Sequence, residues 1–253
     1  MPNIELNQWW EPREPSRADD ARKLMNFVNG LPRFDSIYAS WLRAPKAGTD
    51  VLPVPLREAE GKQLLIDNMA RYDVGGVWRE MGSEMGSNVG AGHAGPPPYD
   101  FRNSSYADTD CRIGCFASRA SKHPNHIFMR LSDIRPSTGR PWRASELRPL
   151  MIFARDIWRP VDMCAMFSFY TCPKIADPTW AAGERTLRPR IGWITYLPPD
   201  LAARATVPAD VHLESLADGA ALVTLCEELF DKTDAAGLAR LRALEAALRP
   251  IQT

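Results

Sequence analysis

One group of residues in the sequence has the composition of a metal site. Cys111 and Cys115 are followed by His123 and His126, and thiolate and imidazole ligands can close a tetrahedral zinc site. The spacings differ from those of common zinc modules, and two cysteines four residues apart on a strand share a face as any buried pair would. We therefore favour core thiols and loop histidines, and we expect no metal and no cofactor.

A second group follows the order of charged residues found in magnesium-dependent nucleases. Asp50 precedes the tripeptide Glu60-Gly-Lys62, and residues of these types can hold magnesium and orient a water molecule. The glutamate and lysine of such a site project from one strand, whereas here they open a predicted helix, on which residues i and i+2 diverge. A solvated first helical turn is the better interpretation.

The motifs of common enzyme classes are missing from the sequence. It has four histidines, and it contains no Gly-x-Ser-x-Gly, no His-Glu-x-x-His and no Gly-Lys-Ser/Thr after a glycine loop. Residues 86–92 resemble a dinucleotide loop only in their glycine content. We expect a protein without enzymatic activity, with a metal-dependent, nuclease-like enzyme as the alternative.

Composition narrows the function further. The 253 residues include 31 Lys and Arg against 31 Asp and Glu, so the formal net charge is zero, which argues against a general nucleic-acid binder. The five cysteines form an odd, sparse set that is typical of reduced thiols. No apolar run approaches the roughly 18 residues that cross a bilayer, and the first residues lack a secretion signal. We expect a cytoplasmic protein with no membrane partner.

The charges are unevenly distributed along the chain. Residues 119–159 contain nine Arg or Lys against three acidic residues, and residues 210–234 contain seven acidic residues against one lysine. These segments could pair with each other, or the second could form an acidic patch that attracts a basic protein. For the second case we name five partner-binding candidates, which are Glu227, Glu228, Asp231, Asp234 and the aromatic anchor Trp10.

Hydrophobic periodicity predicts the elements that must position these residues. Helices are predicted at residues 16–31, 35–44, 57–72, 145–159 and 234–249. Strands are predicted at residues 3–10, 111–118, 126–132, 161–170, 191–197 and 219–226. The strand at 161–170 is apolar on both faces, which is typical of a central strand.

These elements predict an α+β fold with a mixed, mainly antiparallel β-sheet and flanking helices. The first two helices are expected to form an N-terminal helical hairpin. We expect a single domain over residues 1–253, with an irregular Gly/Pro-rich insertion at about 82–109.

Several fragments of the sequence are familiar when taken in order. They are Trp10-Glu-Pro-Arg-Glu before a helix, Trp41, Asp177-Pro178-Thr-Trp180, Gly192-Trp193-Ile-Thr-Tyr196-Leu and the late strand at 218–224. Together they resemble the immunity protein 52 family of bacterial polymorphic toxin systems. The resemblance runs from Trp9 to the final helix, and residues 82–109 match nothing in it.

The resemblance implies a non-enzymatic protein that binds and neutralises a cognate toxin. In this family the toxin is typically a nuclease of restriction-endonuclease fold, delivered into neighbouring cells by a secretion system, here by type VI secretion. Its antidote would act in the cytoplasm and make no direct contact with nucleic acid. The family fragments are mostly apolar or turn-forming, so they report the fold and not the toxin-facing residues. An effector adaptor or scaffold protein is a further alternative.

Overall fold

The computed structural model describes residues 4–10, 17–39, 41–43, 99–103, 112–116, 125–135, 137–167, 189–230 and 233–252. Contacts within the chain divide it into two compact units, each assembled from separate segments. The first unit comprises residues 1–8, 132–152 and 160–253, and the second comprises residues 9–131 and 153–159. Each unit has its own strands and its own buried side chains.

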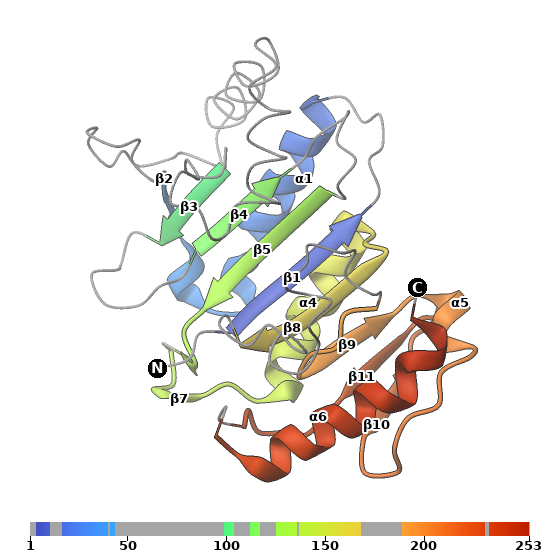
Figure 1. The fold of residues 1–253 in the computed structure, drawn as a ribbon. Coiled ribbons are helices and arrows are strands. Elements are labelled where there is room, and N and C mark those ends of the chain that lie inside the picture. The colour runs from blue at the N-terminus through green and yellow to red at the C-terminus, as the bar shows by residue number, and fades with distance from the viewer. Residues whose placement is uncertain are drawn as a thin grey trace, which may run out of the picture. The chain divides into compact units, whose positions relative to one another are not determined.

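The first unit is built on five neighbouring strands (Figure 1). Their spatial order is β10 (His212–Ser215), β11 (Ala221–Thr224), β9 (Ile194–Leu197), β8 (Asp162–Phe167) and β1 (Ile4–Trp10), whose last two residues belong to the second unit. The pairs β10/β11, β11/β9 and β9/β8 are antiparallel. Because β8 and β9 lie inside this array, consecutive residues are buried on both faces, at 162–165 of β8 and 194–197 of β9.

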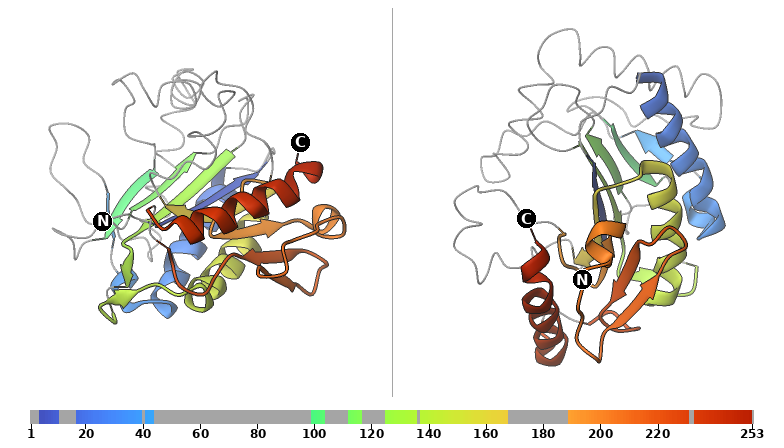
Figure 2. Two further views of the ribbon diagram at one scale, coloured as in Figure 1. Left: turned by 60° about the horizontal axis from the view of Figure 1, so that its bottom comes forward. Right: turned by 90° about the vertical axis from the view of Figure 1, so that its right-hand side faces the viewer.

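Helices cover both faces of the strands β8 to β11 (Figure 2). On one face lies the first half of α4 (Ala144–Trp158), and on the other lies α6 (Ala235–Leu248). Each helix buries an apolar stripe at the helical period, formed by Leu147, Leu150 and Met151 in α4 and by Leu241, Leu244 and Leu248 in α6.

Shorter elements complete the first unit. The hairpin of β6 (Ile134–Arg135) and β7 (Arg140–Pro141) precedes α4. A single turn, α5 (Pro199–Ala202), follows β9, and the 3₁₀ turn η4 (Arg249–Ile251) ends the described chain.

The second unit contains four antiparallel strands, in the order β5 (Asn125–Leu131), β4 (Arg112–Phe116), β3 (Tyr99–Asn103) and β2 (Trp41–Arg43). The helix α1 (Arg17–Gly30) leads into the 3₁₀ turns η1 (Leu31–Arg33) and η2 (Ser36–Ala39). An aromatic cluster lies at its core, where Trp158 stacks on Trp10 at 5.1 Å and meets Phe27 edge-on at 6.2 Å between ring centroids.

The predicted fold class is confirmed, because the described elements are α+β and mainly antiparallel. The central strand, the helix at 145–159 and the last helix with Asp234 at its start are also confirmed. The single-domain assignment of residues 1–253 stays a prediction. The predicted helix at 57–72 and most of the insertion at 82–109 lie outside the described residues, apart from β3.

The prediction of a second helix in the N-terminal hairpin is wrong. Residues 36–39 form a 3₁₀ turn, and Trp41–Arg43 form a strand that pairs with Phe101–Asn103. Apolar residues from Ile37 to Leu42 fit a helical period, but the decisive ladder comes from a strand about sixty residues later. The periodicity of a short segment carries no information about a strand pairing with a distant part of the chain.

Candidate partner-binding surface

Two of the acidic residues proposed to bind a partner, Glu227 and Glu228, lie beside the start of α4. After β11 the chain runs antiparallel to residues 142–144, with a bridge between Arg143 and Glu228 and a 2.8 Å hydrogen bond from Ala144 N to Glu227 O. This places Glu227 and Glu228 next to the helix N-terminus, where backbone N–H groups and the helix dipole favour negative charge. The two glutamates differ in how firmly their carboxylates are bound within the chain.

Glu227 is held by α4 itself. Its carboxylate accepts hydrogen bonds from the Ser145 hydroxyl and from Ser145 N, the latter at 3.4 Å. Glu228 is 82 % exposed at its side chain, and its ion pair with Arg143 is long, at 3.9 Å. Such an exposed pair contributes little to stability. Glu228 is therefore the member of this pair whose carboxylate is open to a partner.

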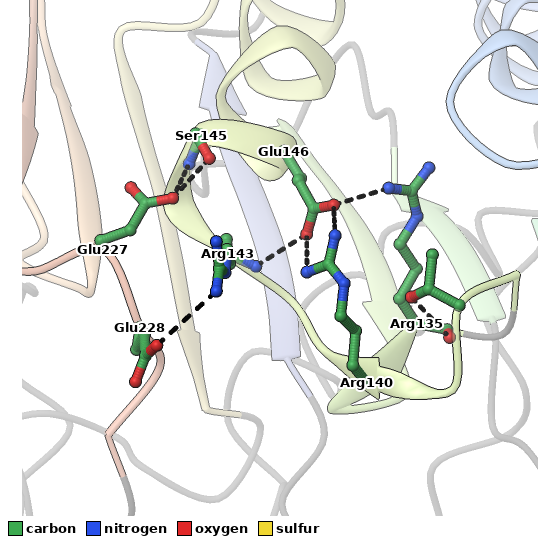
Figure 3. Close-up of polar contacts among 8 residues, drawn as sticks. Arg135, Arg140, Arg143, Ser145, Glu146, Glu227 and Glu228 are labelled. Carbon is green, nitrogen blue, oxygen red and sulfur yellow. Dashed lines mark hydrogen bonds and ion pairs between the residues drawn. The ribbon is translucent and has the colours of Figure 1, made fainter.

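Glu146 anchors a second set of polar contacts one residue further along α4 (Figure 3). Its Oε1 accepts hydrogen bonds from Arg135 at 2.8 Å and from Arg140 Nη2 at 2.6 Å, and its Oε2 accepts from Arg140 Nη1 at 3.1 Å. Oε2 also accepts from the backbone N–H of Arg143 at 3.1 Å, in the manner of the third helical residue of a capping box. The carboxylate thus joins the β6–β7 hairpin to the helix start.

These contacts change the titration of Glu146. Partial burial opposes its charged form, but the hydrogen bonds from Arg140, Arg143 N and Arg135 outweigh burial and hold the pKa below its usual value. Together with Glu227 and Glu228, the cluster of Figure 3 contains three arginines and three glutamates. The cluster therefore carries charges of both signs and is not a purely acidic patch.

The basic middle and the acidic late segment are joined by two ion pairs among the described residues. Arg148 of α4 forms a two-pronged ion pair with Glu214 of β10, and Arg143 pairs with Glu228. The hydrogen bond from Arg148 lowers the pKa of Glu214, and Glu214 in turn raises the pKa of Arg148. Of the two interpretations drawn from charge distribution, mutual pairing therefore accounts for part of the acidic segment.

The remaining partner-binding candidates are Asp231, Asp234 and Trp10. Asp234 lies at the N-cap of α6, where its Oδ1 accepts a 2.9 Å hydrogen bond from Ala236 N. Asp231 lies outside the described residues. Trp10 is only 2 % exposed and stacks on Trp158, so its prediction as an exposed anchor is wrong. Its neighbour Trp9 is the more accessible of the two, because adjacent strand residues face opposite sides.

Four residues of the family fragments, Trp41, Gly192, Trp193 and Tyr196, lie in or next to the strands β2 and β9. Gly192 lies where an added Cβ would come within 2.4 Å of Ala165 O, Trp193 donates from Nε1 to Cys226 O at 2.8 Å, and Tyr196 is buried on β9. Trp41 belongs to β2. Asp177, Pro178 and Trp180 lie outside the described residues.

The described structure adds no support for a metal site or for a nucleophilic cysteine. Among the described residues, no three His, Cys, Asp or Glu side chains gather as metal ligands would. Burial raises the pKa of both cysteines whose thiols are described, Cys164 and Cys226, whereas a nucleophilic thiol needs a lowered pKa. Cys111, His123 and the Asp50, Glu60, Lys62 set lie outside the described residues.

Sequence reasoning missed the cluster around Glu146. Its signal was present, because Arg143-Ala-Ser-Glu146 places a glutamate at the third position of a helix, from which it can reach back to the N-cap backbone. The contribution of the β6–β7 hairpin could not be foreseen, because that hairpin has only two residues in each strand.

Within the described ranges, none of the helices combines the length and the apolar character that crossing a bilayer demands.

Comparisons with known proteins identify a shared fold. No protein-family model matches the sequence, and no curated protein matches it. Among solved structures, the chain is similar to one described as Pseudomonas aeruginosa T6SS protein PA0821, with a TM-score of 0.52 and 10 % sequence identity. The similarity covers 99 % of this chain and 73 % of that chain. At this level of identity it is the fold of the chain that is similar to that protein.

Proposed function

We propose that this chain is an immunity protein that binds and neutralises a cognate effector of a type VI secretion system. The observation that carries the proposal is the fold similarity to a protein described as a T6SS protein, which extends over 99 % of this chain. The family resemblance of the sequence points the same way.

The proposal gives the protein a binding function without catalysis or cofactor. The expected target is a nuclease effector, and the protein would act in the cytoplasm of the producing cell and its kin. Complexes tight enough to protect a cell typically bury about 1,200–2,000 Å² and depend on a few central residues. The cluster around Glu146 provides charged groups held by hydrogen bonds, and Glu228 adds an exposed carboxylate. Charged groups of both signs favour one partner over others.

Co-expression with a candidate toxin, such as one encoded by an adjacent gene, tests this proposal. We expect a sensitive strain to survive when both proteins are produced, and to die when the toxin is produced with an unrelated protein. Co-purification with a catalytically inactive toxin gives the second readout. Death despite stable co-purification would assign the chain to the adaptor class, and absence of binding would refute the immunity function.

Glu228 allows a finer test of the surface. Because its carboxylate is exposed and only loosely paired, Glu228→Lys should weaken binding to a basic effector surface and reduce the dependence of binding on salt. Glu228→Gln removes the charge without adding the opposite one and should have a smaller effect. Equal affinity and equal salt dependence for both variants and the unaltered protein would exclude Glu228 from the interface.

A further inference from the structure

The strand β10 lies at one end of the five-strand array, so among the described strands it pairs along one edge only, with β11. Its hairpin with β11 has a three-residue turn, in which Gly219 adopts a positive φ of 83°. Leu216 N donates to Ala220 O at 2.7 Å, which makes Leu216 and Ala220 a hydrogen-bonded pair. This pair fixes the pattern of the hairpin, because hydrogen-bonded and non-hydrogen-bonded pairs alternate in an antiparallel ladder.

The register then assigns every backbone group of β10. Glu214 lies opposite Leu222 and His212 opposite Thr224, at even spacing from the Leu216 pair, so both direct their N–H and C=O groups toward β11. Leu213 and Ser215 therefore direct theirs away from β11. On the far side of β11, Leu225 N donates to Trp193 O, so the odd-numbered residues of β11 bond to β9 and the even-numbered ones to β10. The β10–β11 ladder and the β11–β9 ladder therefore agree on which backbone groups of β10 point away from β11.

The outer edge thus presents two donors and two acceptors in line. Among the residues that the structure describes, no backbone hydrogen bond joins Leu213 or Ser215 to anything outside the hairpin. Edge strands with unsatisfied groups are templates for another strand. A backbone edge alone does not say what kind of strand would fit.

The side chains on the α6 face supply that information. Cross-strand partners share a face, so Leu213, Val223, Thr195 and Cys164 form one row across β10, β11, β9 and β8. The last three are fully buried, but Leu213 is 38 % exposed and is the exposed large hydrophobic residue of the described chain. The row that packs against the α6 side therefore continues to the edge and ends in an uncovered apolar side chain.

The opposite face of β10 is polar. Glu214 is bound there by Arg148 of α4, and exposed His212 lies two residues away on the same side. Because Arg148 already neutralises Glu214, this face supplies no net charge that would repel an incoming strand. An added strand would need an apolar residue opposite Leu213 and polar residues directed toward the Glu214 side.

We propose that β10 is a docking edge for an extended segment of the effector, which joins the sheet as an added strand. The proposal rests on the proposed immunity function and names the place where the partner binds. Four residues span only about 13 Å, which is too short a strip for a stable symmetric dimer, since stable interfaces bury about 800 Å² on each partner. An effector that docks here can contact further surfaces of this chain as well.

Amide hydrogen exchange gives the direct test. In the protein alone, the amides of Leu213 and Ser215 should exchange rapidly while that of Glu214 is protected by β11. On addition of an inactivated toxin that this protein neutralises in the co-expression test, the Leu213 and Ser215 amides should become protected. Protection that instead rises with the concentration of this protein alone would assign the edge to a second copy and overturn the proposal.

Two variants test the edge by different routes. Ser215→Pro removes an outward N–H and leaves the β11 ladder intact, and Leu213→Lys keeps the backbone but removes the apolar contact. Each should weaken toxin binding about tenfold or more, whereas the control Thr206→Lys, at an exposed residue of the same unit, should not. Melting temperatures close to that of the unaltered protein would establish that the variants fold.

The two proposals fail separately. If the unaltered protein neither binds the toxin nor protects cells, the immunity function is refuted. If it binds with full affinity, and neither the two variants nor hydrogen exchange shows any effect at β10, the docking edge is refuted while the immunity function stands.

Discussion

The carboxylate of Asp234 has two possible roles that charge counting along the chain does not separate. It belongs to the acidic segment, yet its Oδ1 accepts the hydrogen bond of Ala236 N at the start of α6. Asn caps a helix about as well as Asp, whereas Ala does not. The two roles can therefore be separated by comparing Asp234→Asn with Asp234→Ala.

We expect Asp234→Ala to lower the free energy of unfolding by about 1 kcal/mol and Asp234→Asn to change it by only a few tenths. Urea denaturation followed by circular dichroism measures both values. Asp234→Asn should also keep full affinity for the effector. Lost affinity at unchanged stability would place Asp234 in the interface after all.

Gly192 is constrained by the backbone that it contacts. An added Cβ would lie 2.4 Å from Ala165 O on the neighbouring strand β8, and a carbonyl oxygen cannot rotate away as a side chain can. Gly192→Ala should destabilise the protein by about 1–3 kcal/mol, as overpacking does. At Gly139, by contrast, an added Cβ meets nothing within 4 Å, and only its positive φ of 65° opposes a side chain.

The matched substitution Gly139→Ala should therefore cost about 1 kcal/mol. Thermal unfolding of the two variants gives the order of their stabilities. If Gly192→Ala were the more stable, the close approach of Gly192 to Ala165 of β8 would be contradicted.

At the scale of elements, Glu146 connects the β6–β7 hairpin to the first turn of α4. Three arginines donate to its carboxylate, from two side chains and one backbone N–H. The folded protein therefore favours the ionised form, and the pKa of Glu146 is lowered on folding. The resulting stabilisation is complete above the unfolded pKa of about 4.3, and it is lost as the pH falls through the lower folded pKa.

We expect Glu146→Gln to cost about 1 kcal/mol near neutral pH, because two of its partners remain partly solvated. The difference from the unaltered protein should shrink as the pH falls below about 4. Urea denaturation over a series of pH values measures it. The control Asp156→Asn, at an exposed carboxylate paired with its neighbour Arg155, should show a small difference at every pH. A pH-independent difference for Glu146→Gln would contradict the contacts described.

Elements with a strong local pattern were predictable from the sequence. The helix at 145–159 repeats apolar residues at the helical period and is confirmed. The strand at 161–170 is apolar on both faces and is confirmed over the described residues 162–167. By contrast, β2 and β10 were missed. β2 has three residues and depends on a distant partner strand, and β10 is mostly exposed, so it lacks the alternation that burial imposes.

The candidate surface was harder to predict than the fold. Glu228 is exposed, and its role in binding a partner stays a prediction. Trp10 is buried because its ring stacks on Trp158 of α4. A sequence pattern shows that adjacent strand residues face opposite sides, and it does not show which side an independent helix will cover. Charge sums have the same limit, since Arg148 and Glu214 are 66 residues apart in the chain and meet only in the folded protein.

At the scale of the whole molecule, neither compact unit is a continuous stretch of chain. The first unit takes residues 1–8 from the N-terminus, and the second takes residues 153–159 from the end of α4. The latter segment carries Trp158, whose ring packs on Trp10 and Phe27. A cut between Leu131 and Ser132 therefore removes β1 from the first unit and the central tryptophan from the second.

We expect fragments 1–131 and 132–253 to lack cooperative unfolding when each is produced alone, and to regain it when they are produced together. The missing Trp158 alone should cost the first fragment about 3–5 kcal/mol, the usual penalty for emptying a large aromatic site, which is a large share of the stability of a small domain. Thermal melts and the dispersion of amide resonances provide the measurement. Cooperative melting of fragment 132–253 alone would mean that β1 is dispensable to the first unit, and the effector could then be tested against that fragment, which retains both β10 and Glu228.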